Sequence, residues 1–237
     1  MHFHLLPGVD DGPRTLDEAI ALARLAVADG TGHVVCTPHV HLVDVASLPG
    51  RVSALDAALR AAEIPLQVAA GGEIRPGTSL EPAELQILAH GPPGRRWVLL
   101  EAPLAPQYLD TFHADADELA SRGYGVLIGH PERCDALMAP DGGLEHRVRH
   151  GAALQVNASS LTGAHGRRSL EAGFELVARG RVAVLASDAH GTHRPPLLGA
   201  ALRALAARGM DGAALVADGP RRLLRDGIPI LRDRPAA

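Results

Sequence analysis

Gly125-Val126-Leu127-Ile128-Gly129-His130-Pro131 is the stretch that best decides the fold, because an apolar run ends directly at a side chain that can bind a metal ion. A short apolar run of this kind predicts a buried strand. The same pattern recurs at residues 97–101, which end at Glu101, and at residues 182–188, which end at Asp188. Helical patterns separate these runs, so the chain predicts parallel strands that are covered by helices.

The whole chain repeats this alternation of strand and helix. We expect strands at residues 2–4, 33–37, 66–70, 97–101, 125–128, 153–156 and 182–186. We expect helices between residues 15 and 30, and at 52–63, 80–89, 108–121, 144–150, 168–179, 197–207 and 219–226. No linker or low-complexity segment interrupts the pattern, so residues 1–237 are predicted to form a single α/β domain.

The composition excludes several classes of function. The net charge is −4, which provides no basic surface for nucleic acid and disfavours a nuclease. All 23 basic residues are arginine, so Schiff-base catalysis, a Walker-A lysine and a Ser-Lys dyad are ruled out. An anionic substrate must therefore be bound by arginine, by metal ions or by backbone N–H groups.

The two cysteines do not form a catalytic or metal-binding motif. Cys36 and Cys134 belong to no C-x-x-C pair, and neither has an arginine six residues later, as a cysteine-dependent phosphatase requires. We expect a reduced, cytoplasmic protein without membrane insertion, because no signal peptide or membrane-spanning run is present. Only Met1 precedes His2, so we expect either that the first strand is short or that the true N-terminus extends before Met1.

Metal-capable side chains follow nearly every expected strand. The set is His2, His4, Asp11, His39, Glu73, Glu101, His130, Asp188 and His190. The carboxyl ends of parallel strands meet at one edge, where active sites assemble. Nine such residues exceed the needs of one ion and predict two or three divalent ions with bridging carboxylates.

Each of these residues also has an ordinary alternative role when taken alone. Glu101 could cap a helix near Pro103, and Asp188 could be an N-cap. Asp10 could replace Asp11, and His41 could replace His39. His165 and His193 lie near the expected site and stay undecided.

Two arginines follow the expected ligands. Arg133 lies three residues after His130, and Arg194 lies in the segment that follows Asp188. The planar guanidinium group can bind two phosphate oxygens at once. The alternative is that both arginines form ordinary surface salt bridges.

The motifs together resemble those of a known superfamily. They are His2-x-His4 with Leu5–Pro13, Cys36-Thr37-Pro38-His39, Gly72-Glu73-Ile74, Leu100-Glu101, His130–Arg133, Leu154–Gly163, and Ser187–His190 with Arg194-Pro195-Pro196. This set resembles the polymerase and histidinol phosphatase (PHP) superfamily. Within it, the chain resembles the bacterial manganese-dependent tyrosine-protein phosphatases of capsule and exopolysaccharide loci.

The resemblance implies a distorted (β/α)7 barrel of the PHP type with a trinuclear site. It implies a first ion held by His2, His4, Glu73 and Asp188, a second by Glu73, Glu101 and His130, and a third by Asp11, His39 and His190. The metal would be manganese, with iron or zinc as alternatives. Arg133 and Arg194 would bind the substrate phosphate, and Asp188, Asp11 or a rim histidine would protonate the leaving group.

The implied reaction is hydrolysis of phosphotyrosine by a metal-activated hydroxide, without a covalent enzyme intermediate. The implied partner is the tyrosine-rich tail of a bacterial tyrosine autokinase that controls polysaccharide export. Two alternatives stay open. The chain could hydrolyse a small phosphomonoester such as histidinol phosphate, or it could be a non-catalytic PHP binding module. The oligomeric state is not predicted.

Overall fold

The computed structural model describes residues 1–230. The strands of this part of the chain are β1 (His33–Cys36), β2 (Gln67–Ala70), β3 (Glu73–Ile74), β4 (Trp97–Glu101), β5 (Gly125–Gly129), β6 (Ala153–Asn157) and β7 (Val182–Ala186). The α-helices are α1 (Leu16–Ala28), α2 (Leu48–Ala61), α3 (Pro82–Leu88), α4 (Leu109–Ser121), α5 (Asp135–Met138), α6 (Leu144–Arg149), α7 (Ala158–Leu161), α8 (Gly166–Ala178), α9 (Leu198–Ala206), α10 (Ala213–Val216) and α11 (Asp218–Asp226). Short 3-10 helices cover Val40–Leu42, Val45–Ser47, Pro106–Tyr108 and Pro131–Arg133.

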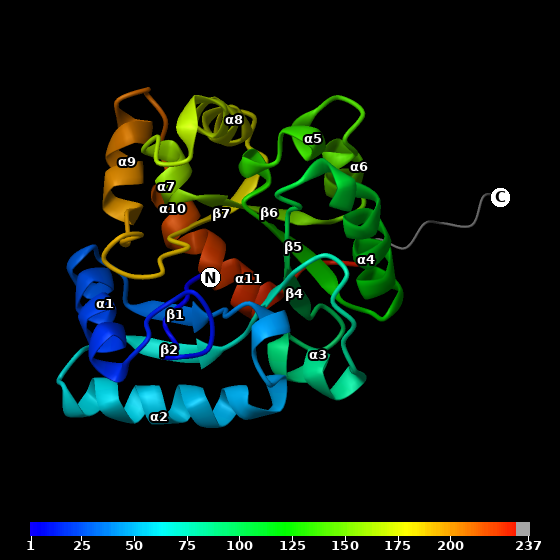
Figure 1. Ribbon diagram of the computed structural model, residues 1–237. Coiled ribbons are helices and arrows are strands. Elements are labelled where there is room, and N and C mark those ends of the chain that lie inside the picture. The colour runs from blue at the N-terminus through cyan, green and yellow to red at the C-terminus, as the bar shows by residue number, and fades with distance from the viewer. Residues whose placement is uncertain (231–237) are drawn as a thin grey trace.

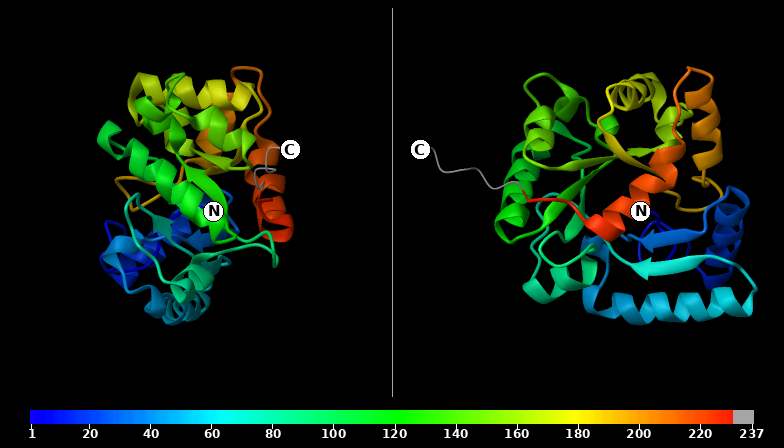
Figure 2. Two further views of the ribbon diagram at one scale, coloured as in Figure 1. Left: turned by 90° about the vertical axis from the view of Figure 1, so that its right-hand side faces the viewer. Right: turned by 180° about the vertical axis from the view of Figure 1, so that it is seen from behind.

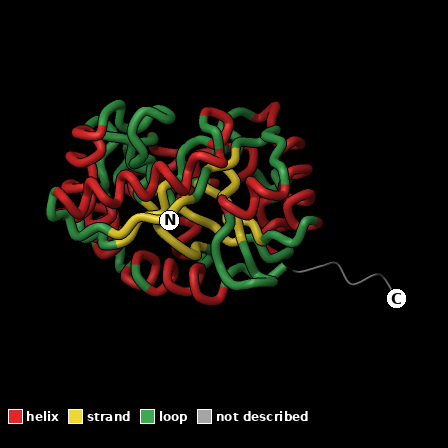
Figure 3. Tube along the Cα trace, turned by 90° about the horizontal axis from the view of Figure 1, so that it is seen from below, coloured by secondary structure: helices red, strands yellow, loops and turns green. Residues whose placement is uncertain are grey.

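The strands form two parallel sheets. One sheet pairs β1 with β2, and the other has the order β3-β4-β5-β6-β7 (Figure 1). Every strand pair of residues 1–230 is parallel, as the alternation of strands and helices predicts. Helices surround the strands on the outside, which is clear when the molecule is seen from below (Figure 3).

The segment at residues 2–4, which we expected to be the first strand, is not a strand. It bonds instead to the segments that directly follow β1 and β7. Thr37 N donates to Phe3 O at 2.9 Å, and His4 N donates to Ala189 O at 3.0 Å. So few bonds on each side do not make a regular ladder. The strands of residues 1–230 therefore form an open, distorted barrel, and residues 2–4 lie between the segments that follow β1 and β7.

Other boundaries also differ from the predictions. The strand count of seven is correct within residues 1–230, but β3 replaces the expected strand at 2–4. Helix α2 begins at Leu48, earlier than the predicted residue 52, because Pro49 is accommodated in its first turn. The short helices α5, α7 and α10 were not predicted. The Thr15 N-cap is confirmed, because its side chain accepts from Glu18 N.

Successive residues of β4 face two different apolar cores. Val98 and Leu100 pack in the core shared with the surrounding helices. Trp97 and Leu99 instead pack in a second core with Leu223 of α11. Trp97 Nε1 donates to Leu223 O at 2.9 Å, and this bond holds α11 against the strands. The view from behind shows α11 crossing the strands (Figure 2). This alternation decides which side chains reach the interior of the barrel.

Candidate metal centre

The inward face of the strands carries the candidate site residues. Glu101 is two residues beyond Leu99, which packs in the inner core, so both have the same orientation along β4. Asp188 follows Ala186 of β7 with the same spacing. Asp188 and His130 both adopt left-handed backbone conformations, with φ of 49° and 37°. Such conformations are uncommon for residues other than glycine, and they are frequent at functional sites.

The structure brings all nine predicted site residues into one cluster. Its side-chain ligand atoms form four overlapping groups, and within each group the atoms lie within 4.8 Å of one another. The groups are His4, Asp11, His39 and His190; His2, His130 and Asp188; His2, His4 and Glu73; and His39, Glu73 and Glu101. These groups differ from the sets that the resemblance implies in two ways. His130 lies with His2 and Asp188 rather than with Glu101, and His39 lies with Glu73 and Glu101 as well as with Asp11 and His190.

Glu73 is the centre of this cluster, because its carboxylate contacts four imidazoles. Oε1 lies 3.0 Å from His130 Nε2 and 3.2 Å from His2 Nε2. Oε2 lies 3.0 Å from His39 Nδ1 and 3.4 Å from His4 Nε2. Glu73 is 1% exposed, so bulk water does not mediate these contacts.

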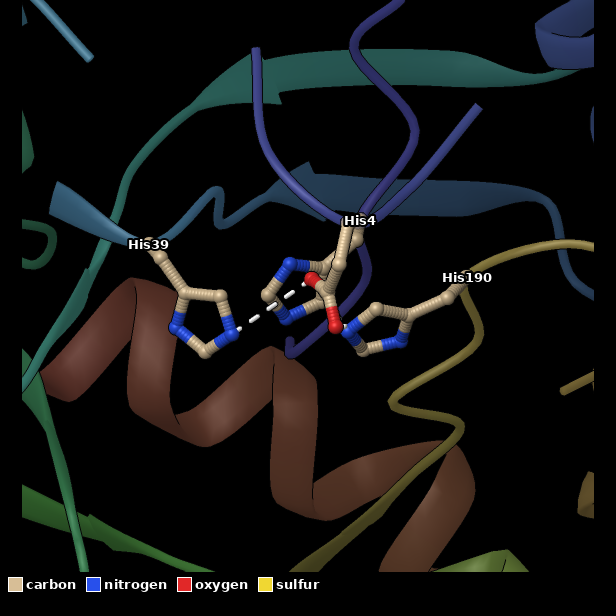
Figure 4. A group of neighbouring side chains, drawn as sticks. His4, His39 and His190 are labelled. Carbon is tan, nitrogen blue, oxygen red and sulfur yellow. Dashed lines mark ion pairs between the residues drawn. The ribbon is translucent and has the colours of Figure 1, made fainter. Parts of the chain in front are cut away.

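The outer nitrogen of three histidines contacts a fixed hydrogen-bond acceptor. His2 Nδ1 contacts Gln155 Oε1 at 2.8 Å, and His4 Nδ1 contacts Asp10 Oδ2 at 2.7 Å. His190 Nδ1 contacts the Asp188 carbonyl oxygen at 2.9 Å. These partners place the proton on Nδ1 and leave Nε2 with a lone pair, as in histidines that bind metals. Figure 4 shows His39 and His190 approaching His4 from the end of β1 and from the loop after β7.

The donor set fits divalent cations. His2 Nε2 and His4 Nε2 lie 3.3 Å apart, and both face the lone pairs of Glu73. Lone pairs that point at each other in a buried space repel unless protons or cations lie between them. Mixed imidazole and carboxylate donors suit first-row divalent ions such as manganese, iron and zinc. The arrangement can therefore hold ions between the Nε2 atoms and the carboxylates.

Electrostatic coupling within the cluster shifts its pKa values. Burial alone would lower the pKa of His4, but the carboxylates of Asp10 and Glu73 outweigh it and raise that pKa to about 10. Burial, together with the charge of Glu73, raises the pKa of Glu101 to about 7. Burial would raise the pKa of Asp188, but the nearby histidines lower it below its ordinary range. The shifts differ within the cluster, because burial lowers the pKa of His130 and of His190.

The two predicted phosphate arginines lie at the edge of this cluster. Arg194 Nη2 donates to Asp188 Oδ2 at 3.0 Å, and Arg133 Nη1 lies 3.4 Å from the same oxygen. Both arginines are half-buried. A cavity of about 510 Å³ adjoins the cluster at Asp11 and His190, and it is lined by Asp10–Arg14, Glu18, Ala21 and His190–His193. Its size is in the range of pockets that hold small molecules.

Four residues were left open as alternative or additional site residues: Asp10, His41, His165 and His193. Each of them lies outside the cluster or contacts one of its members. Asp10 does not replace Asp11 in the cluster: its Oδ2 contacts His4 Nδ1 and accepts from His39 N at 3.1 Å. His41 is exposed, with its ring 5.6 Å from the ring of His39. His165 Nε2 contacts Ser159 Oγ at 2.9 Å, and His193 is exposed.

Sequence reasoning missed three buried residues behind the cluster, Glu132, Gln155 and Asn157. The spacing of Gln155 and Asn157 on an otherwise apolar strand was the available signal. Both cysteines are buried, and burial raises the pKa of Cys36 to about 12, so neither is a reactive thiolate.

Comparison with known proteins identifies the family. The family model "Capsular polysaccharide synthesis, CpsB/CapC" matches residues 1–225. The chain belongs to the CpsB/CapC family. It is 32% identical over 198 residues to the tyrosine-protein phosphatase YwqE of Bacillus subtilis, covering 80% of this chain and 76% of the relative. It is 30% identical over 206 residues to the putative tyrosine-protein phosphatase CapC of Staphylococcus aureus, covering 84% and 79%.

Solved structures agree with this membership of the CpsB/CapC family. A structure from work on YwqE of Bacillus subtilis and CpsB of Streptococcus pneumoniae, described as metal-dependent tyrosine phosphatases, has a TM-score of 0.77 at 29% identity and covers 94% of this chain and 92% of that one. The lactonase Lmo2620 of Listeria monocytogenes has a TM-score of 0.56 at 14% identity, covering 94% and 93%, and shows similarity of fold alone. Within residues 1–230, no helix is long and apolar enough to cross a membrane.

Proposed function

We propose that this chain is a metal-dependent protein-tyrosine phosphatase whose centre holds two or three divalent ions. Manganese is the proposed metal, and iron and zinc are the alternatives. The observation that carries this proposal is the Glu73 carboxylate, which contacts three buried imidazoles and the half-buried imidazole of His39 beside two half-buried arginines. Two relatives of this chain are named as tyrosine-protein phosphatases, one of them as putative, and these names support phosphotyrosine as the substrate class.

The proposed ligands are the nine residues of the cluster: His2, His4, Asp11, His39, Glu73, Glu101, His130, Asp188 and His190. Glu73 would be the bridging ligand, because it belongs to two of the four groups and its two oxygens face different histidines. Divalent ions bound there would lower the pKa of a water molecule and neutralise phosphate charge.

Arg133 and Arg194 bind the substrate phosphate in the proposed reaction. In the structure both guanidinium groups contact the same oxygen of Asp188, at the edge of the cluster. An entering phosphate offers stronger acceptors that match the planar guanidinium fork. The arginines then stabilise the charge that develops on the equatorial oxygens during phosphoryl transfer. Asp188 holds both arginines near this position before the substrate arrives.

The leaving group of phosphotyrosine is a phenolate, which departs with little acid assistance. A covalent cysteine intermediate does not fit, because Cys36 and Cys134 are 0% and 3% exposed. The cavity that reaches Asp11 and His190 is the proposed entrance for the tyrosine side chain and its peptide. The residues that line it include the exposed Arg14 and His193.

The proposed partner is a phosphotyrosine-containing protein, specifically the tail of a bacterial tyrosine kinase that controls polysaccharide export. Support comes from the description of the family, which is capsular polysaccharide synthesis. A flexible tail also suits a buried centre, because a peptide can insert one side chain where a folded domain cannot.

A substrate panel tests the proposal. The purified protein is assayed with phosphotyrosine peptides, phosphoserine peptides and histidinol phosphate, each with manganese and with a chelator. We expect hydrolysis of phosphotyrosine only with metal, and recovery when manganese is added after chelation. Hydrolysis that is indifferent to the chelator would overturn the metal centre. A strong preference for histidinol phosphate would overturn the assignment of phosphotyrosine.

A further inference from the structure

We propose that Gln155 and Asn157 form a buried amide pair that fixes the ring of His2 and the carboxylate of Asp188, so that both amides are positioning residues of the metal centre. The inference rests on the proposed function, because it concerns ligands of that centre. Gln155 and Asn157 are both 0% exposed at the carboxyl end of β6. They are two residues apart and therefore face the same side of the strand.

The orientation of the Gln155 amide follows from its two contacts. Its Nε2 donates to Asn157 Oδ1 at 2.7 Å, so its oxygen is the atom that faces His2 Nδ1 at 2.8 Å. A carbonyl oxygen only accepts, so Nδ1 of His2 must carry the ring proton. The lone pair of His2 is then on Nε2, which lies 3.2 Å from Glu73 and 3.3 Å from Asp188.

The orientation of Asn157 is fixed by the same logic. Its oxygen accepts from Gln155, so its Nδ2 donates to Asp188 Oδ2 at 2.7 Å. Its backbone is held as well, because Asn157 N donates to the buried Glu132 Oε1 at 3.0 Å. Glu132 Oε1 also accepts from Ser160 Oγ at 2.7 Å, which fixes that carboxylate. A rigid chain of hydrogen bonds therefore connects Glu132 to Asp188 and His2.

The two oxygens of Asp188 have different surroundings. Oδ1 faces the histidine cluster, at 3.3 Å from His2 Nε2, whereas Oδ2 contacts Asn157, Arg194 and Arg133. In the proposed reaction the two arginines turn toward the phosphate. Asn157 is wholly buried and cannot follow them, so it keeps Asp188 in place when the arginines are engaged.

Isosteric variants of Gln155 separate positioning from packing. Gln155→Met keeps the volume and removes the acceptor, and we expect manganese to bind about 10-fold to 100-fold more weakly in calorimetric titrations. Gln155→Glu keeps an oxygen toward His2 and, when protonated, a hydroxyl toward Asn157, so we expect affinity within a few-fold of wild type. A residue that acts only by packing gives the reverse order, because methionine is tolerated in a core and a carboxyl group is not.

Controls make the outcomes distinct. Gln67→Met is the matched control on exposed β2, and the melting temperature of each chelated variant measures any loss of stability apart from metal binding. If Gln155→Met binds manganese as wild type does, the amide-pair inference is overturned while the proposed function stands. If wild type itself binds no divalent ion, the proposed centre fails and the inference fails with it.

A second measurement applies even if Gln155→Met does not fold. Asn157→Ala and Arg194→Ala each remove one donor from Asp188 Oδ2, so their effects on manganese affinity should be coupled. We expect the double variant to lose at least 10-fold more affinity than the product of the single losses. Purely multiplicative losses would show that Asn157 does not secure Asp188, and would overturn the inference.

Discussion

Replacing Arg194 by alanine should reduce turnover without removing the metal ions. In the proposed mechanism, the Arg194 guanidinium group leaves Asp188 and donates to the substrate phosphate. A hydrogen bond to a charged group contributes about 1.5–3 kcal/mol. Loss of one such bond in the transition state lowers kcat/KM about 10-fold to 150-fold. Metal content should be retained, because Asp188 Oδ2 still accepts from Asn157 at 2.7 Å.

The assay for this prediction combines kinetics with metal analysis. We would measure kcat/KM on a phosphotyrosine peptide, inhibition by inorganic phosphate, and bound manganese by mass spectrometry after gel filtration. Phosphate should inhibit the Arg194→Ala variant more weakly, because it loses the same contact as the substrate. Arg167→Ala is the matched control, since the Arg167 side chain is 88% exposed and pairs only with Glu171 on its own helix.

Two results would refute the reasoning about Arg194. If kcat/KM is unchanged, Arg194 does not contact the phosphate in the transition state. If activity and bound manganese fall together in Arg194→Ala, the residue supports the metal centre rather than the substrate. Neither result decides the assignment of the nine proposed metal ligands, which can be measured independently.

Three further predictions follow from other parts of the structure. Asp188→Asn, which tolerates the left-handed backbone at φ 49°, should lose manganese affinity and all measurable turnover; retained metal would contradict its role as a ligand. Burial raises the pKa of Glu132 to about 7, so the contribution of Glu132 to the stability of the metal-free protein is lost as the pH rises from about 4.5 to about 7. The Glu132→Gln variant should flatten this pH dependence of the free energy of unfolding, measured with denaturant in the presence of a chelator. An unchanged pH profile would contradict the prediction. The double variant Cys36→Ala/Cys134→Ala should keep the kcat of wild type on a phosphotyrosine peptide, whereas loss of kcat in a folded, metal-loaded variant would revive a thiolate mechanism.

Most of the nine cluster residues could be predicted because the ends of apolar strands are visible in sequence. In a buried run such as Trp97–Leu100, alternate side chains point inward, and Glu101 lies at the next inward position. The barrel then brings the ends of all such strands to one place. Gln155 and Asn157 lie at the end of the same kind of run, but amides were not recognised as parts of a metal site. Their role depends on hydrogen bonds across the barrel, which spacing along one strand does not encode.

The ends of the fold were harder to predict than its middle. Strand β3 has two residues, too few for any periodicity, and its position depends on close packing of the preceding glycines. A Cβ atom on Gly72 would lie 2.6 Å from Val40 Cγ2, so only glycine lets the chain approach there. The segment at residues 2–4 has strand-like spacing, yet its neighbours on both sides are irregular loops. The seven residues 231–237, which belong to the predicted domain, lie outside the described part of the chain.

The bonds of residues 2–4 to the segments that follow β1 and β7 have a consequence for how the protein matures. Asp11 and Arg194 are 183 residues apart in sequence, yet their side chains lie 3.5 Å from each other at the cluster. During synthesis the early histidines leave the ribosome first, long before Asp188 and His190 exist to complete the proposed ligand set. In the proposed centre, metal capture would therefore be a late event that follows synthesis of nearly the whole chain. Once bound, the ions would cross-link a loop of almost the entire domain, and restraints on such long loops remove the most entropy from the unfolded state.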